Sequence, residues 1–267
     1  KYWIFGNFFG MDMRLLPTII SNVKYSILEY DYKYCKYRSP EKHQAAENKQ
    51  CDCHNQMHGK MISAFFYEAR SLFWMSKAQM EKYHEKFPFL RNTKNEVLSS
   101  VFDERFFNTV SSLVKDKNRK KEGWVVVGSN SWIKGVVESE NYCKENNLKY
   151  EVIWNLKYED LLEKLSVSEG LVFLPNGNDT CPRLVIEAKL LGCDLIINDH
   201  VQHASEDWFK TRDLEKTLKH LYFARDRFWN QIKKHIEYNP TISGYTTTLN
   251  CIKQDYPFIQ SIKSMIG

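Results

Sequence analysis

The sequence lacks most features that would set the chain apart from ordinary globular proteins. No apolar run approaches the length that spans a bilayer, and the first residues do not resemble a secretory signal. Glycine and proline number 11 and 7 in 267 residues, without a repeat or low-complexity tract. These absences argue against fibrous, disordered and membrane-spanning classes. The chain starts at Lys1 rather than Met, which leaves open whether a segment precedes it.

A disulfide framework is also missing. The seven cysteines are an odd number, and four are scattered singly along the chain, at Cys143, Cys181, Cys193 and Cys251. A chain of this length with such spacing is not typical of a disulfide-rich secreted protein. We therefore expect a reducing, cytoplasmic location, with peripheral contact at the inner face of a membrane left open.

Charge of either sign is not strongly in excess. The formal net charge is +5, and 27% of the residues are charged. This mild basicity fits anionic partners such as nucleotides, phosphates or a membrane surface, but does not by itself indicate nucleic acid. The 43% hydrophobic and 14% aromatic content is ample for a sizeable core.

A charged, apolar-poor break at residues 115–123 divides two similar patterns. After it, short β-branched or apolar runs alternate with amphipathic stretches. The expected strands are 124–128, 149–155, 170–175 and 193–199, and the expected helices are 135–146, 158–169 and 181–192. This alternation predicts a parallel sheet with right-handed crossovers.

The half before the break has a looser pattern of the same kind. The expected strands are 1–5, 24–31, 71–76 and 96–102, and the expected helices are 13–23, 60–69 and 77–87. An irregular insertion rich in Cys and His occupies roughly 35–59. The last 60 residues look helical, with 214–236 as the longest stretch. We predict an acceptor-side α/β domain at 1–114, a nucleotide-sugar-binding domain at 122–240, and a C-terminal helix at 241–267 that packs back on the first domain.

The stretch GNDTCPRLVIEAKLLGC, residues 177–193, carries polar groups where ligands bind in open α/β sheets, beyond the carboxyl end of a strand. Pro182 suits the first turn of a helix, whose amides favour an anion. Arg183 offers a bidentate contact to phosphate, and Asp179 and Glu187 offer acceptors for sugar hydroxyls. Each also has a structural reading, as a turn acid, a helix acid or a surface ion pair. Together they point to a nucleotide sugar.

These residues resemble the C-terminal signature of family 4 and related GT-B glycosyltransferases, in which an acid is followed after seven residues by Glu-Ala. Asp179 stands at the first acid, where most members have Glu, and Glu187 with Ala188 matches the second. WVVVGSNSWIKG, residues 124–135, is similar to the strand and Lys-Gly turn that opens the nucleotide-binding domain. Lys134 matches the diphosphate-binding lysine, whereas the arginine usual in that turn is absent.

The resemblance implies an α/β, GT-B-like fold: two Rossmann-like domains with parallel sheets facing a cleft, the N-terminal one compact. It implies a hexosyltransferase-like enzyme, retaining and metal-independent, that needs no cofactor beyond its nucleotide-diphosphate sugar. Lys134, Asp179 and Glu187 would act in catalysis. His58 would contact the sugar or acceptor. The residues implied to bind the donor are Gly128, Ser129, Lys134, Gly135, Asn178, Asp179, Thr180, Arg183 and Glu187.

The insertion itself predicts a structural zinc site. It holds six Cys and His residues, of which Cys35, His43, Cys51 and Cys53 are the best four ligands. Zinc takes four such ligands tetrahedrally and can staple a loop that has no core of its own. A surface loop with reduced thiols is the alternative reading.

Several functions remain open at this stage. A glycan, cell-surface polysaccharide or lipid-linked acceptor is what the resemblance most often implies. The Lys- and Tyr-rich stretch 24–38 makes DNA a less favoured acceptor, since lysines bind phosphates and aromatic rings stack on bases. A degenerate nucleotide-sugar-binding protein and a zinc-stapled nucleic-acid-binding protein are further alternatives.

Overall fold

The computed structural model describes residues 1–116 and 119–236. The first half contains the strands β1 (Tyr2–Phe5), β2 (Lys24–Glu29), β3 (Leu72–Trp74) and β4 (Asn95–Val97), and the helices α1 (Leu16–Asn22), α2 (Pro40–Glu47), α3 (Met57–Tyr67), α4 (Lys77–Lys86) and α5 (Glu104–Lys115). The second half contains β5 (Trp124–Val127), α6 (Val136–Glu145), β6 (Tyr150–Ile153), α7 (Tyr158–Ser166), β7 (Gly170–Phe173), α8 (Arg183–Leu190), β8 (Asp194–Ile197), α9 (Asp207–Lys210), α10 (Leu214–Tyr222) and α11 (Ala224–Lys233).

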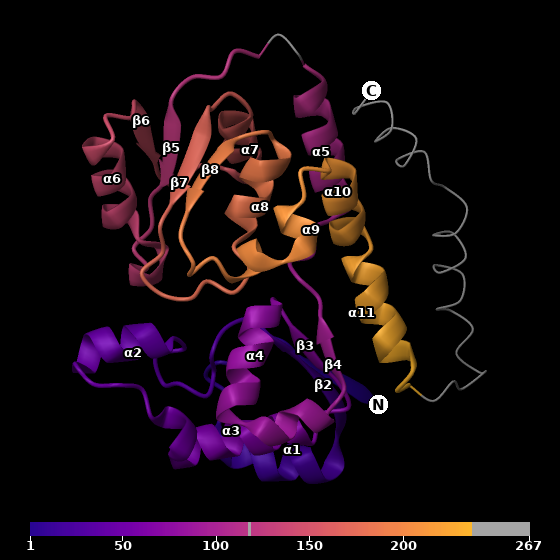
Figure 1. The fold of residues 1–267 in the computed structure, drawn as a ribbon. Helices are drawn as coiled ribbons and strands as arrows, with labels where there is room; N and C mark the ends of the chain where they lie inside the picture. Colours follow the sequence, from indigo (N-terminus) through magenta and orange to yellow (C-terminus); the bar gives the residue numbers. More distant parts are fainter. Residues whose placement is uncertain (117–118, 237–267) are drawn as a thin grey trace.

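The strands form two four-stranded sheets, one in each half, and every pairing is parallel. The first sheet has the order β1-β2-β3-β4 and the second β6-β5-β7-β8. Figure 1 shows two layered bodies, one above the other: the lower contains the first sheet, and the upper contains the second sheet together with α5. The predicted fold class, α/β with two Rossmann-like domains, is confirmed. Within the described residues, no helix is long and apolar enough to cross a membrane.

The two central strands of the second sheet, β5 and β7, are apolar throughout and pack on both faces. Val125 and Leu171 point to the core shared with α8, whereas Val126 and Val172 point to the smaller core that contains Cys143 of α6. Neighbouring residues of a strand face opposite sides, so a continuous apolar run fills both cores. The sheet is therefore held rigidly between helices, and its loops project from fixed strand ends.

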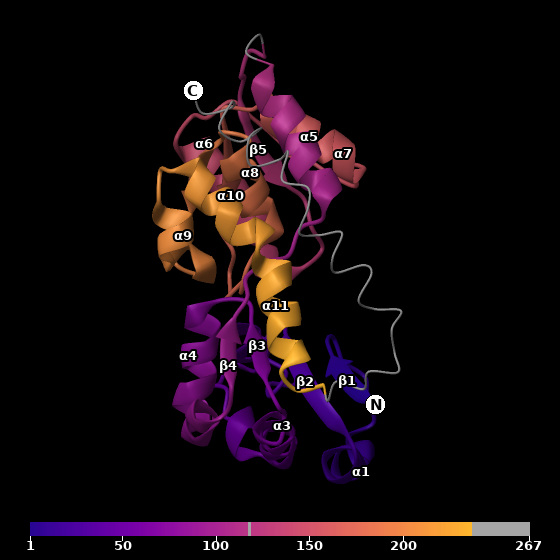
Figure 2. The same cartoon turned by 90° about the vertical axis from the view of Figure 1, so that its right-hand side faces the viewer.

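Helix α11 connects the two halves. The predicted helical stretch 214–236 is divided at Phe223 into α10 and α11. Figures 1 and 2 show α11 running down from the second domain beside the first sheet. Phe228 contacts Phe73 of β3 with ring centroids 4.7 Å apart, and Gln231 donates to Ser71 Oγ at 3.2 Å. The C-terminal helix predicted at 241–267 lies outside the described residues.

Three aromatic rings form a stack between α9, α10 and the turn that precedes α9. Trp208 lies between His203, 5.5 Å away, and His220, 4.6 Å away, with both rings nearly parallel to the indole. Burial disfavours the protonated imidazoles, which lowers the pKa of His203 to about 3 and that of His220 to about 4. Both histidines are therefore neutral in the folded protein near pH 7.

We expect the protein to lose stability as the pH falls from about 6.5 towards 4. In that range the unfolded histidines bind protons that the folded ones do not, so acid favours unfolding. At pH 5, each histidine costs about 2 kcal/mol relative to pH 7. The His203→Phe variant should retain its Tm at pH 7, because neither ring nitrogen has a hydrogen-bond partner in the described part of the chain. Between pH 7 and pH 5, its Tm should fall less than that of the parent. An equal fall would contradict the assignment of this acid sensitivity to His203.

Candidate active site

The order of the second sheet creates a crevice between β5 and β7. From β5 the chain goes to β6 on one side of it, then crosses to β7 on the other side. Loops that leave two adjacent parallel strands in opposite directions open a gap at their carboxyl ends, where ligands bind in such folds. Lys134 follows β5 and Asp179 follows β7. Both therefore lie at this switch point.

Lys134 and Asp179 form an ion pair there, with Nζ 2.6 Å from Oδ2. The Asp179 side chain is 13% exposed and the Lys134 side chain 39%, so the pair faces the gap rather than bulk solvent. The backbone fixes Asp179, whose N–H donates to the His200 carbonyl at 2.9 Å and whose carbonyl accepts from the Gln202 N–H at 3.1 Å. The lysine thus meets an acid that the loop after β8 holds in place.

A cleft of about 480 Å³ opens over this pair, between the two domains. Its lining contains four basic residues and two acids, so an anion is favoured. The second domain contributes Ser131, Ile133, Lys134, Asn178, Asp179 and Thr180, and the first contributes Phe9, Tyr30, Asp31, Lys36, Tyr37, Arg38 and Lys42. Arg38 already has partners within the first domain: it forms an ion pair with Asp31 and lies over the Phe9 ring. Lys42 forms no ion pair within the described residues.

A buried carboxylate organises the first-domain side of this cleft. Glu29, at the end of β2, accepts from the N–H groups of Asp31 and Lys33 at 3.2 Å each and from Lys33 Nζ at 3.1 Å. The Tyr83 hydroxyl donates to it at 3.1 Å. Burial raises the pKa of Glu29 to about 7, against the opposing effect of Lys33. This carboxylate holds the Tyr30–Lys33 turn against the cleft.

Polar contacts join the two domains along the carboxyl ends of both sheets. The Thr180 hydroxyl donates to the Tyr30 carbonyl at 2.7 Å, and the Tyr32 hydroxyl donates to Gln202 Oε1 at 2.8 Å. The Asn178 amide donates to Glu41 of α2. Asn178 and Thr180 were predicted to bind the donor; both line the cleft, but in this state their side chains bind the first domain.

Glu187 lies apart from the cleft lining, in a cluster of its own. It is 2% exposed, and its Oε1 accepts from the Tyr158 hydroxyl at 2.8 Å. Arg183 lies 3.5 Å from the same oxygen, donates to the Tyr158 hydroxyl at 3.1 Å, and covers the Phe102 ring. Burial raises the pKa of Glu187, with Tyr158 and Arg183 opposing the shift. Within the described residues, Glu187 Oε2 forms no hydrogen bond.

The remaining predicted residues shape the loops or lie elsewhere. Gly128 packs under the Trp154 indole, and Ser129 accepts a hydrogen bond from the Ser131 N–H at 3.1 Å. Gly135 is in the left-handed region, with φ 58°. His58 is exposed on α3, 2.8 Å from the Lys33 carbonyl oxygen, and is not among the cleft-lining residues.

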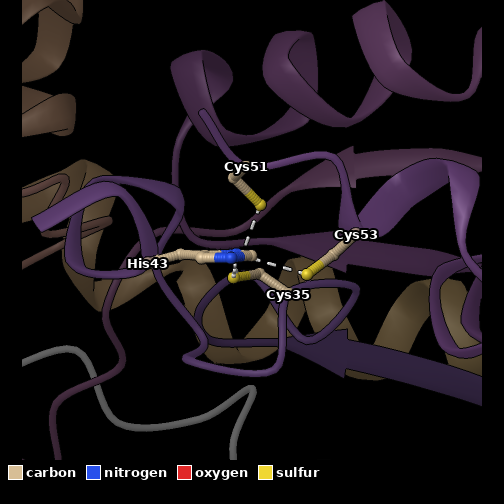
Figure 3. Close-up of side chains that lie close together, drawn as sticks. All are labelled: Cys35, His43, Cys51 and Cys53. Carbon is tan, nitrogen blue, oxygen red and sulfur yellow. Dashed lines mark hydrogen bonds between the residues drawn. The ribbon is translucent and has the colours of Figure 1, made fainter. Parts of the chain in front are cut away.

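The structure brings together all four predicted metal ligands, Cys35, His43, Cys51 and Cys53 (Figure 3).

Of the tyrosines in the stretch 24–38, Tyr25, Tyr32 and Tyr34 are buried in the first domain's core. They cannot stack on bases there, which removes most of the support for DNA as a partner.

The sequence patterns do not predict the first-domain wall of the cleft or the partner of Glu187. Arg38 and Lys42 were part of the Cys- and His-containing insertion, with no signal that they face Lys134. In the sequence, Tyr158 stands only at the start of a predicted helix. Its position at the carboxyl end of β6, the strand beside β5, was the available clue.

No protein-family model and no curated protein matches this sequence. Among solved structures, sucrose-phosphate synthase from Thermosynechococcus elongatus is 12% identical, with a TM-score of 0.49 over 73% of this chain and 55% of that one. The UDP-forming α,α-trehalose-phosphate synthase from Burkholderia xenovorans is 8% identical, with a TM-score of 0.48 over 84% and 67%. The chain thus spans about half the length of the first. Both neighbours are glycosyltransferases, and their likeness to this chain does not single out family 4.

The Lys134 turn should be sensitive to a single added methyl group. A Cβ at Gly135 would overlap the Leu174 carbonyl, whereas nothing lies within 4 Å of a Cβ at Gly10, which also has positive φ. We expect Gly135→Ala to destabilise the fold by about 2 kcal/mol or more, and Gly10→Ala by about 1 kcal/mol, because only the first adds a clash to the backbone strain. Urea unfolding would measure both. Equal losses would show that the close approach is not important.

Proposed function

We propose that this protein is a glycosyltransferase that takes its sugar from a nucleotide-diphosphate sugar. The observation that carries the proposal is the Lys134–Asp179 pair, which sits at the switch point of a parallel sheet and opens into a basic cleft between two α/β domains. The motif resemblance adds independent support, because these two residues and Glu187 match the donor-binding pattern of GT-B glycosyltransferases.

In the proposed mechanism, Lys134 binds the diphosphate and stabilises the charge that develops on it as the glycosidic bond breaks. Donor binding exchanges the ion pair with Asp179 for one with phosphate. Asp179 is then free to accept a hydroxyl of the sugar. A lysine in a partly desolvated cleft can supply this charge stabilisation, so we propose transfer that needs no metal at the reacting centre. We also propose retention of the anomeric configuration and a hexose as the sugar.

Glu187 is proposed to bind the ribose of the donor. Its unpartnered Oε2 can accept a sugar hydroxyl while Oε1 keeps the Tyr158 hydroxyl as donor. Arg183, half exposed beside it, can reach a phosphate or a ribose oxygen. The nucleoside would then lie along the carboxyl ends of β6, β5 and β7, with its diphosphate towards Lys134.

The acceptor is proposed to enter from the first domain, across the wall that carries Arg38 and Lys42. A glycan or a lipid-linked precursor remains the proposed acceptor class.

A degenerate protein that binds the donor without transferring the sugar is the second candidate, because Asp179 already neutralises Lys134. Release of free nucleoside diphosphate from the bound donor, with acceptor present, would favour the enzyme; tight binding without release would favour the degenerate protein.

A panel of UDP-, GDP- and ADP-sugars should identify the donor by thermal unfolding, with a CMP-sugar, which has one phosphate, for comparison. At about a hundred times its dissociation constant, the correct donor should stabilise the fold by roughly 2.7 kcal/mol, a Tm shift of several degrees. Lys134→Ala should weaken its binding roughly ten- to a hundredfold, since a hydrogen bond to a charged group is lost. Lys120→Ala, in the exposed break, is the matched control and should bind normally. No shift from any donor would overturn the proposal.

Glu187→Gln should weaken donor binding by about tenfold, because an amide oxygen accepts a sugar hydroxyl less strongly than a carboxylate. Since the contact is to the ribose, calorimetry should give the same factor for the nucleoside diphosphate with and without its sugar. Tyr158→Phe should bind at least as well as the parent, because it leaves the carboxylate free. If Tyr158→Phe weakened binding as much as Glu187→Gln, the cluster would be structural rather than a ribose site.

A further inference from the structure

Four thiol and imidazole groups converge on one point of the first domain (Figure 3). Cys35 lies in the loop after β2, His43 on α2, and Cys51 and Cys53 in the turn before α3. Their ligand atoms all lie within 4.8 Å of one another, and three of the four side chains are buried. We infer that these residues form a structural zinc site, which also fixes the first-domain wall of the cleft.

The spacing of the ligand atoms agrees with tetrahedral zinc. Bonds of about 2.3 Å to sulfur and 2.0–2.1 Å to nitrogen place two sulfurs roughly 3.8 Å apart, and a sulfur and a nitrogen roughly 3.6 Å apart. The distance from Cys51 Sγ to Cys35 Sγ is 3.6 Å. His43 Nδ1 lies 3.7 Å from Cys35 Sγ and 3.3 Å from Cys53 Sγ. Three edges of the tetrahedron therefore agree to within a few tenths of an ångström.

The surroundings of His43 are those of a metal-bound imidazole. Its Nε2 lies 3.2 Å from Glu47 Oε2, one turn along α2, while its Nδ1 faces the sulfurs. Glu47 is oriented by the Tyr37 hydroxyl, which donates to Oε1 at 3.1 Å. The described residues leave His43 Nε2 without a completed hydrogen bond, but Glu47 is the carboxylate close enough to accept its N–H and so to favour the tautomer needed for ligation. Three sulfurs and one nitrogen select zinc over magnesium or calcium, which take oxygen ligands.

Helix α2 has little apolar packing to hold it in place. Its sequence, PEKHQAAE, has no apolar stripe, and His43 is its only buried residue. A helix of this composition cannot be held to the domain by hydrophobic packing. Cys35 and Cys53, by contrast, belong to the first domain's core. A metal that joins His43 to these two cysteines would anchor α2, because the free energy of metal binding then contributes to folding.

The same anchor positions residues that face the second domain. Lys36, Arg38 and Lys42 lie between Cys35 and His43 in sequence and line the cleft. Glu41 of α2 accepts the Asn178 amide from the loop after β7. The metal therefore sits behind the cleft wall and not at the reacting atoms. This assignment does not depend on glycosyl transfer.

The full chain, purified under reducing conditions, should contain about one zinc by elemental analysis. Replacing the metal with Co²⁺ should give the visible and near-ultraviolet bands of a tetrahedral thiolate site. Cys51→Ser, which changes the half-buried ligand, should lose at least tenfold in zinc affinity, measured by competition with a chelator. Cys143→Ser, a buried thiol on α6, is the matched control and should retain the metal.

Glu47→Gln should keep the zinc but bind it about ten- to a hundredfold more weakly, as expected for loss of an outer partner. Two results would overturn the inference: a parent chain that takes up neither zinc nor Co²⁺, or a Cys51→Ser variant that binds zinc as tightly as the parent. If Cys51→Ser does not fold, the Co²⁺ spectrum of the parent alone decides whether the four residues bind a metal. These experiments measure metal binding and not turnover. Their outcome is therefore independent of the donor-binding experiments.

Discussion

Parallel pairing is the constraint on which the rest of this structure depends. A parallel strand can be reached only by a crossover that returns to the sheet's starting edge, so every strand ends on the same side. Here two such sides face each other. The contacts of Thr180 with Tyr30 and of Tyr32 with Gln202 are made between loops that leave carboxyl ends. The cleft is thus a result of topology, and the loops decide its chemistry.

The loops divide that chemistry between two separate acids. Asp179 neutralises Lys134 in the cleft, whereas Glu187 is buried deeper, against Tyr158 and Arg183. The first acid already pairs with a cation in the cleft, whereas the second is held by a hydroxyl and a guanidinium away from it. The first domain adds cationic side chains from the segment between Cys35 and His43. The cleft therefore joins the loops of the second domain to a first-domain wall that lies next to the Cys and His cluster.

Sequence patterns predicted the second domain well because its central strands are packed on both faces. Runs such as WVVV and GLVF have no other stable place, and Gly135 and Gly192 mark the turns. The convergence of the four Cys and His residues was also predictable, because few residue types ligate zinc. The cleft wall was not, since Arg38 and Lys42 line one cleft with Lys134 only once the two domains have packed together. The same holds for the Tyr158–Glu187 pair, which only the packing of α7 beside α8 creates.

The chain passes between the domains twice, after β4 and between α10 and α11, and these two passages are bound to each other. Arg227 Nη2 donates to the Leu98 carbonyl at 3.2 Å, and Ser99 Oγ lies 3.2 Å from His220 Nε2. The two connections therefore lie side by side, and these contacts tie the first passage to the second at the place where the chain leaves one domain for the other.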